Sequence, residues 1–305
     1  MAGDHDVHDL ESIRREIVDV APEFLDEPIT WLGEGMDSFA VLVGGAVVFR
    51  FAKHEDAAAG LRREIALLPR LAPTLSLAIP RFQYVGEHSV TKLPFVGYAM
   101  IRGTALDPRL YRGLPEATLD GILGDLASFL GAVHAFPIDE ATACGVIPFG
   151  GRVHYVEDLQ RARDDVFPLL NSAVRQTVQS QLEAFLADDA NFVYAPVLLH
   201  ADLWPEHVLF SPRVGRLAGV IDFGDVSIGD PDYDLAFLGR RLGSGFIAEL
   251  VRHFPHVDPA RLAEKIRCFN LLNAIDDVFI GLERGDRLSV DSSLADLAEQ
   301  HEDAQ

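Results

Sequence analysis

Short apolar segments dominate the first third of the chain, and their pattern is typical of β-strands. Residues 38–43 and 46–51 form two such segments. Gly44–Gly45 between them predicts a hairpin, because paired glycines suit the tight turns that join antiparallel strands. Two more strands are predicted over residues 80–86 and 95–101. We therefore expect this part of the chain to form a sheet.

Helical spacing is present in two stretches of the same part. Residues 8–20 predict a short amphipathic helix. Residues 57–71 predict a longer one, because apolar residues recur on one face at Leu61, Ile65 and Leu68.

From Pro115 onward the pattern is mainly helical. Helices are predicted over residues 119–134, 155–170, 174–186, 233–242, 245–253 and 259–282. A short β-hairpin, with segments at 208–210 and 217–223, separates the first three of these helices from the others.

Together these elements predict an α+β fold with two lobes. A small N-terminal lobe, residues 1–98, is expected to hold an antiparallel sheet and one helix. A hinge of residues 99–105 leads to a larger, mainly helical C-terminal lobe, residues 106–305.

The charge balance narrows the class of partner. Lys and Arg number 26 against 47 Asp and Glu, so the formal net charge is −21. Nucleic acid and anionic membranes repel such a chain, and we expect to find neither among its partners. A cationic small molecule suits the charge better, although the charge can equally serve solubility alone. No obligate protein partner is evident.

The chain has two cysteines, a polar start, and no apolar run of the roughly 18 to 20 residues that a membrane span needs. We therefore expect a cytoplasmic protein without a disulfide framework or a zinc site.

Candidate chemistry gathers around two aspartates. Asp202 follows the apolar run Val197–Leu199, so it should leave a buried segment and enter a loop. Asp222 comes twenty residues later, after the predicted hairpin, which returns the chain to its start. Asp202, His207 and Asp222 should therefore surround one point. Phosphoryl transfer needs a carboxylate that orients the attacking hydroxyl, and ligands that hold Mg²⁺ against a triphosphate, and these residues can supply both.

The order His200-x-Asp202, then His207, then Asp222 resembles the aminoglycoside and macrolide phosphotransferases of the protein-kinase-like fold. Gly229–Ala236, with the sequence GDPDYDLA, matches a segment of the same family. The resemblance is strongest to the aminoglycoside 2″-phosphotransferases and macrolide kinases. It implies that Asp202 is the catalytic base and that His207 and Asp222 are Mg²⁺ ligands.

Two further aspartates of this region are interpreted as structural. Asp230 is expected to cap a helix, and Asp234 to anchor the catalytic loop from a buried position. A protein kinase is disfavoured, because Asp230–Pro231 follows Asp222 too closely to leave room for a long activation segment.

The resemblance also assigns a loop that covers the nucleotide phosphates. Gly33, Gly35 and Ser38 stand before the predicted hairpin, where such a loop is expected to bring its backbone N–H groups close to a triphosphate.

A cation should follow on the next strand, held by a glutamate of the following helix. Arg50 and Glu64 fit this pair, because strand alternation places Arg50 on the same face as Val48. Lys53 is the alternative phosphate-contacting cation.

Residues 97–103 match the hinge of the family, where main-chain groups near Ala99 and Ile101 would pair with the purine. Tyr98 would border the back of this pocket. In the resembling group a bulky tyrosine at that position goes with GTP. We expect GTP as the phosphate donor, with ATP as the alternative, and Mg²⁺ as the cofactor.

The acceptor is expected in the C-terminal lobe. Asp276, Asp277 and Glu283, together with Asp202, are candidate contacts for a cationic antibiotic. Residues 237–241, however, lack the acidic cluster that several aminoglycoside 2″-phosphotransferases carry there. We expect a kinase that inactivates an aminoglycoside by phosphorylating a hydroxyl. A macrolide 2′-phosphotransferase and a metabolic small-molecule kinase remain open. A catalytically silent nucleotide-binding module is disfavoured, because Asp202 and Asp222 are both present.

Overall fold

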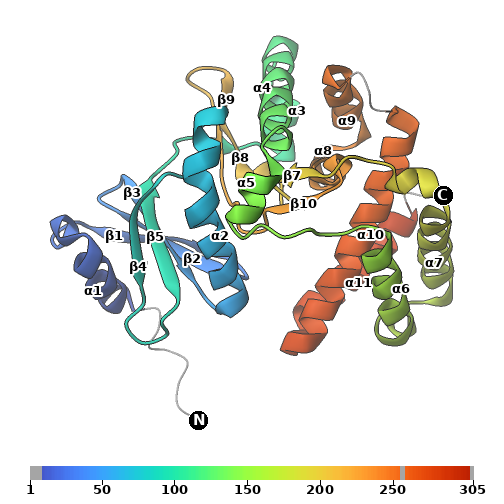
Figure 1. Ribbon diagram of the computed structural model, residues 1–305, viewed down its shortest axis with the longest axis horizontal. Coiled ribbons are helices and arrows are strands. Elements are labelled where there is room, and N and C mark those ends of the chain that lie inside the picture. The colour runs from blue at the N-terminus through green and yellow to red at the C-terminus, as the bar shows by residue number, and fades with distance from the viewer. Residues whose placement is uncertain (1–8, 255–257, 303–305) are drawn as a thin grey trace.

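The computed structural model describes residues 9–254 and 258–302 (Figure 1). Its N-terminal part contains an antiparallel sheet of five strands in the order β1-β2-β3-β5-β4. The strands are β1 (Ile29–Glu34), β2 (Ser38–Val43), β3 (Val47–Ala52), β4 (Phe82–Glu87) and β5 (Pro94–Ala99). The antiparallel sheet predicted from the sequence is confirmed.

The hairpin of β2 and β3 turns at the two glycines. Val43 pairs with Val47, and both Gly44 and Gly45 have positive φ, 58° and 65°. Two successive positive φ angles produce the turn that matches the twist of antiparallel strands, and glycine adopts them without a side-chain clash.

Two helices cover the sheet, one on each face, and they match the helices predicted over residues 8–20 and 57–71, although the expected fold class has one helix in this lobe. Helix α1 (Leu10–Val20) buries Ile13 and Ile17 among the phenylalanines of one face. Helix α2 (Glu55–Leu71) buries Leu61 against the other face. Figure 1 shows α2 between the sheet and the helical part of the molecule.

The remainder is mostly helical, as predicted, and three pairings of short strands lie within it. The helices are α3 (Pro108–Gly113), α4 (Glu116–His134), α5 (Ile138–Ala143), α6 (Arg152–Asp165), α7 (Ser172–Ala187), α8 (Ala236–Leu242), α9 (Ser244–Leu250), α10 (Pro259–Arg284) and α11 (Arg287–Glu302). The short strands are β6 (Thr104–Ala105), β7 (Val197–Leu199), β8 (Val208–Ser211), β9 (Arg216–Val220) and β10 (Ser227–Gly229). They pair as β7 with β10, β6 with β8, and β8 with β9.

Several helices differ from the prediction, and the short helices α3 and α5 were not predicted. Helix α6 ends at Asp165, before Pro168, and a 3₁₀ turn replaces its expected end. Helix α11 was not predicted, although Val290, Leu294 and Leu297 have helical spacing, and it packs along α10.

The two structural aspartates occupy the predicted roles. Asp234 is fully buried and accepts hydrogen bonds from the N–H groups of His200, at 3.2 Å, and Ala201, at 2.8 Å. Asp230 caps the turn before α8 by accepting from the Asp232 N–H at 3.1 Å. The start of the catalytic loop is therefore fixed to the segment that leads into α8.

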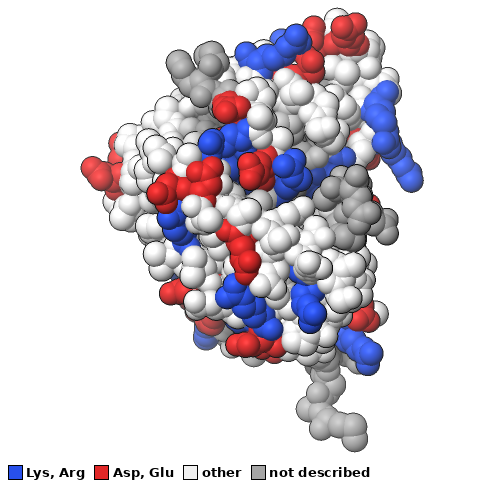
Figure 2. Space-filling view, turned by 90° about the vertical axis from the view of Figure 1, so that its right-hand side faces the viewer, with Lys and Arg blue, Asp and Glu red and all other residues white. Residues whose placement is uncertain are grey.

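None of the helices in the described ranges is long and apolar enough to cross a membrane. On the face shown in Figure 2, acidic and basic side chains are interspersed. The negative net charge therefore does not collect into a single patch on that face.

Candidate active site

The catalytic loop leaves strand β7 through a constrained turn. Ala201 has a positive φ of 65°, a conformation that costs a non-glycine residue on the order of 1 kcal/mol, and the hydrogen bond to Asp234 holds it there. The next residue, Asp202, reaches the surface of a cavity with its side chain 25% exposed.

The buried imidazole of His200 connects this loop to the end of strand β9. Its Nε2 lies 3.2 Å from the carbonyl oxygen of Ile221, and its Nδ1 accepts from the Asp202 N–H at 3.3 Å. A carbonyl oxygen only accepts, so Nε2 carries the proton and Nδ1 carries none. Burial lowers the pKa of His200 to about 4, which keeps this neutral form at ordinary pH.

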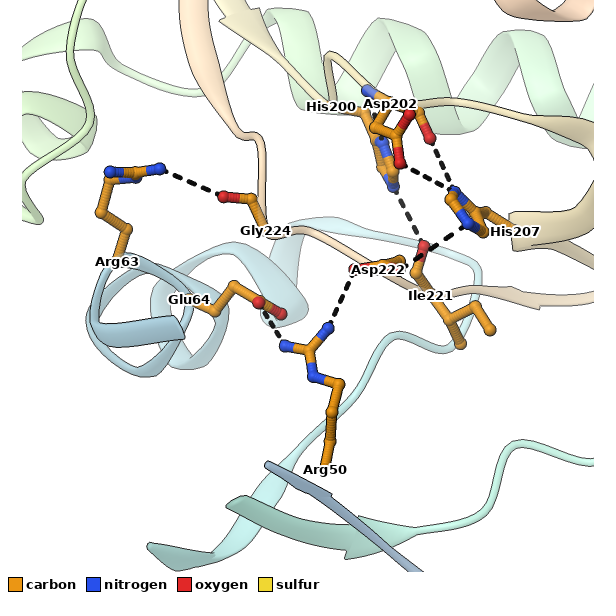
Figure 3. A network of polar contacts seen from close by, with 9 residues as sticks. All are labelled: Arg50, Arg63, Glu64, His200, Asp202, His207, Ile221, Asp222 and Gly224. Atoms are coloured by element: carbon orange, nitrogen blue, oxygen red, sulfur yellow. Dashed lines mark hydrogen bonds and ion pairs between the residues drawn. The ribbon is translucent and has the colours of Figure 1, made fainter. Parts of the chain in front are cut away.

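The β8–β9 hairpin returns the chain to the catalytic loop, as the sequence predicts. The N–H of Ile221 donates to the His207 carbonyl at 3.0 Å, which places Asp222 beside His207. One ligand atom from each of Asp202, His207 and Asp222 lies within 4.8 Å of the other two. Figure 3 shows the three side chains converging.

His207 is oriented for a metal ligand. Its Nδ1 lies 2.7 Å from the main-chain carbonyl oxygen of Asp202, so Nδ1 donates and carries the proton. In the neutral ring Nε2 then carries no proton, and its lone pair is available to a metal. Nε2 lies 3.7 Å from Asp222 Oδ2. A hydrogen bond that fixes the tautomer in this way is common around ligating histidines.

The same residues fit a divalent cation by their chemistry. Two carboxylates and one imidazole nitrogen converge, and the carboxylates are the oxygen ligands that Mg²⁺ prefers. Asp222 and His207 would hold such an ion. Burial acts to raise the pKa of Asp222, but Arg50 and then His207 outweigh it, so the net pKa is lowered and the carboxylate is ionised.

The other two carboxyls near this point have raised pKa values. Burial is the largest cause for both, and it raises the pKa of Asp202 to about 7 and that of Asp225 to about 6. Neighbouring carboxylates add to the effect on each, and His207 opposes it. A base with a pKa near neutrality is well matched to accepting a proton at physiological pH.

Arg50 lies on β3 and bridges two acids. Its guanidinium donates to Asp222 Oδ1 at 2.9 Å and forms a second ion pair with Glu64 of α2 (Figure 3). Only 12% of the Arg50 side chain is exposed. Lys53, by contrast, contacts Glu34 at 2.6 Å and the Gly35 carbonyl at 3.0 Å, so its side chain is bound to the glycine-containing loop between β1 and β2.

The glycine-containing loop forms one wall of the cavity at this point. The cavity has a volume of about 530 Å³, and Gly35 and Ser38 line it together with Arg50, Asp202 and Asp222. The N–H of Gly35 donates to the Ser38 carbonyl at 2.8 Å, within the loop. Gly33 is not among the lining residues.

The predicted hinge residues lie at and beyond the end of β5. Tyr98 packs beside Val48 on the α2 face of the sheet, and burial raises its pKa to about 12. Ala99 pairs with Val47, and the Ile101 side chain lies against Gly219 of β9. Their contacts with a purine remain predictions.

A second cavity, of about 380 Å³, adjoins the first. Asp202, Trp204, Asp225 and Arg63 line both cavities. Asp202 therefore lies between the two cavities.

The predicted acceptor residues separate in the structure. Asp276 and Asp277 of α10 line the second cavity. Glu283 is not among its lining residues, and its carboxylate accepts from Arg161 at 2.8 Å instead. Burial raises the pKa of Asp276 to about 7, and the neighbouring Asp158 contributes.

Several residues of the second cavity were not predicted, namely Phe149, Trp204, Asn273, Arg63 and Arg240. Trp204 lies two residues beyond Asp202, and that position alone is a usable signal. The other four come from distant elements that only the folded chain brings together.

Comparison with known proteins identifies the family of this chain. Residues 29–264 match the model of the phosphotransferase enzyme family, which is more than half of the chain. The chain belongs to the phosphotransferase enzyme family. The family and the enzyme class predicted from the sequence are confirmed, whereas the roles of single residues remain predictions.

Individual relatives of this phosphotransferase include antibiotic kinases. Viomycin phosphotransferase of Streptomyces vinaceus is 26% identical over 215 residues, which cover 69% of this chain and 73% of that protein. The GDP and kanamycin complex of APH(2″)-IIIa is 30% identical and has a TM-score of 0.91, with 95% of this chain and 98% of that chain covered. Macrolide 2′-phosphotransferase type I has a TM-score of 0.74 at 22% identity, covering 95% and 97%, a likeness of fold alone.

Mutation can decide whether Arg50 or Lys53 is the phosphate-contacting cation of this phosphotransferase. We expect Arg50→Ala to lower kcat/KM for the nucleotide by about a hundredfold or more, since it removes a buried charge aimed at the reaction centre. Lys53→Ala should change it by less than about fivefold, because its ion pair is partly exposed. Steady-state kinetics with varied nucleotide measure both. A larger loss in Lys53→Ala than in Arg50→Ala would contradict the assignment.

Proposed function

We propose that this phosphotransferase transfers the γ-phosphoryl group of GTP to a hydroxyl of an aminoglycoside antibiotic and thereby inactivates it. The observation that carries the proposal is the position of Asp202, a half-buried carboxyl between two cavities, beside His207 and Asp222. The similarity to a protein solved with both GDP and kanamycin supports the choice of donor and acceptor.

In the proposed reaction each residue has one task. Asp202 accepts the proton of the acceptor hydroxyl and orients its oxygen in line with the γ-phosphorus. Asp222 and His207 hold Mg²⁺, which neutralises charge on the triphosphate when bound. Arg50, oriented by Glu64, binds phosphate oxygens.

The donor site would lie in the cavity below the glycine-containing loop, with the base near the hinge. Gly35 and Ser38, which line this cavity, would border the phosphates, whereas Gly33 lies outside its lining. Main-chain groups near Ala99 and Ile101 would pair with the purine. Tyr98 supports GTP through its bulk at the back of the base pocket, and ATP is the alternative donor.

The acceptor site would be the second cavity. Asp276 and Asp277 supply negative charge for the amino groups of an aminoglycoside. Arg240 adds a cation to the same wall, although it is paired with Asp296 at 2.5 Å. Glu283 would act only at the periphery, if an acceptor extends that far.

A macrolide acceptor is the second candidate, and the apolar part of the cavity wall favours it. Its apolar and aromatic lining residues include Ile147, Phe149, Trp204, Phe237 and Ile280. Macrolides present a large apolar surface and a single amine, which such a wall would accommodate. A metabolic small-molecule acceptor is a further alternative.

An acceptor panel tests the function. We expect kanamycin-type or gentamicin-type acceptors to stimulate turnover with GTP more than viomycin or a macrolide does. We expect Asp202→Ala to reduce acceptor-dependent transfer by about a hundredfold or more. Phosphorylated product would be detected by mass spectrometry, with GTP and ATP compared at equal low concentration.

The outcomes of this panel are distinct. Nucleotide hydrolysis that ignores every acceptor and survives Asp202→Ala would rule out the proposed mechanism. Stimulation by a macrolide alone would replace the acceptor assignment, and equally efficient use of ATP would remove the preference for GTP.

Binding of a cationic acceptor should depend on pH through Asp276. Because its pKa is raised to about 7, the carboxyl is ionised above that pH and neutral below it. The KM for an aminoglycoside should therefore rise by about five- to tenfold between pH 8 and pH 6. Asp276→Asn should flatten this rise, and Glu283→Gln on the same helix should preserve it. The reverse result for the two variants would contradict the role of Asp276.

A further inference from the structure

Two consecutive residues of helix α2, Arg63 and Glu64, connect it to the turn of residues 222–224, which holds the proposed metal ligand Asp222. Glu64 pairs with Arg50, which in turn holds Asp222. Arg63, its neighbour in the chain, donates from Nη2 to the carbonyl oxygen of Gly224 at 3.2 Å. Figure 3 shows Arg63 bonded to Gly224, and Glu64 paired with Arg50, which reaches Asp222 at the other end of the segment.

This turn requires support from outside. Asp222 has a positive φ of 66°, which is an unfavourable conformation for a residue with a side chain. On one side the N–H of Ile221 is bonded to the His207 carbonyl. On the other side, Arg63 is the side chain that binds the Gly224 carbonyl.

Helix α2 lies directly against the turn. Gly60 faces it one helical turn before Arg63, and a Cβ atom added at Gly60 would lie 2.7 Å from the Gly224 carbonyl oxygen. A side chain at Gly60 would therefore push the helix and the turn apart, because the atom it meets belongs to the backbone. The glycine permits the close approach that the Arg63 hydrogen bond needs.

Arg63 also lies where the two cavities meet. It lines both of them, and its Nε is buried without a hydrogen-bond partner among the residues described. Burial raises the pKa of Asp225, the residue after Gly224, and the charge of Arg63 opposes this rise. The guanidinium of this half-buried side chain is therefore held at the turn.

We propose that Arg63 is a positioning residue that fixes the turn after Asp222 to helix α2 and so holds the Asp222 carboxylate toward His207. Arg50 fixes the carboxylate itself, and Arg63 fixes the backbone two residues later. The inference rests on the proposed role of Asp222 as a Mg²⁺ ligand. It assigns to α2 a second task, besides presenting Glu64.

The test compares two neighbouring arginines. Arg63→Ala should weaken the Mg²⁺-dependent part of GDP binding by about tenfold or more, since a hydrogen bond from a charged donor is lost. GDP binding without Mg²⁺ should stay unchanged. Arg63→Lys should restore part of the loss. Arg62→Ala is the matched control, because Arg62 is exposed on the same helix and pairs only at 3.5 Å with Glu55.

Isothermal titration calorimetry of GDP with and without Mg²⁺ measures these changes in the full-length protein. Gly60→Ala is a second variant, and it should weaken Mg²⁺-dependent binding in the same direction without removing a charge. If Arg63→Ala does not fold, Arg63→Lys and Gly60→Ala decide, with thermal unfolding as the check on folding.

Two results would overturn the inference. One is Mg²⁺-dependent GDP binding in Arg63→Ala that equals that of Arg62→Ala. The other is a rise in acceptor KM alone, which would make Arg63 a contact of the acceptor and not of the turn. Failure of the proposed function is distinguishable, because the wild-type protein would then show no acceptor phosphorylation, whatever the variants do.

Discussion

The ion pair between Arg50 and Asp222 is the contact on which the rest of the site depends. Arg50 comes from the sheet and Asp222 from the helical part, so the pair joins the two sides of the cleft. Burial would raise the pKa of Asp222 and favour its neutral form, and the positive charge of Arg50 offsets this effect. Without that offset, the carboxyls of Asp202, Asp222 and Asp225 would share protons, and the proposed metal ligands would lose negative charge.

Two constrained backbone positions bring the acids together. Ala201 and Asp222 both have positive φ. The turn at Ala201 directs the carboxylate of the next residue, Asp202, into the cleft, and the turn at Asp222 directs its own. Each is held by a group far away in the sequence, Asp234 for the first and α2 for the second. Strain of this kind persists where the surrounding structure determines it, and it is common at functional sites.

Local pattern predicted much of the fold and the centre of the site. The spacing from Asp202 to Asp222 encodes a hairpin, and a hairpin necessarily returns the chain to its start. Strand alternation likewise favoured Arg50 over Lys53 as the phosphate-contacting cation, and the structure pairs Arg50 with Glu64 of α2. These inferences need only the geometry of one element.

The acceptor side could not be predicted in the same way. Asp276 and Glu283 are seven residues apart, so they share a helix face, but they lie about 10 Å apart along the axis. Only the extent of the cavity decides which of them lines it. Arg63 was missed for a similar reason, because its meaning depends on how α2 docks against Gly224.

The central claim is that Asp222 and His207 hold the metal beside Asp202. Anomalous X-ray scattering at the manganese edge, from crystals grown with Mn²⁺ and a non-hydrolysable GTP analogue, tests it most directly. We expect one anomalous peak at bonding distance from Asp222 Oδ and His207 Nε2. A metal bound to the nucleotide but to neither of these residues would contradict it.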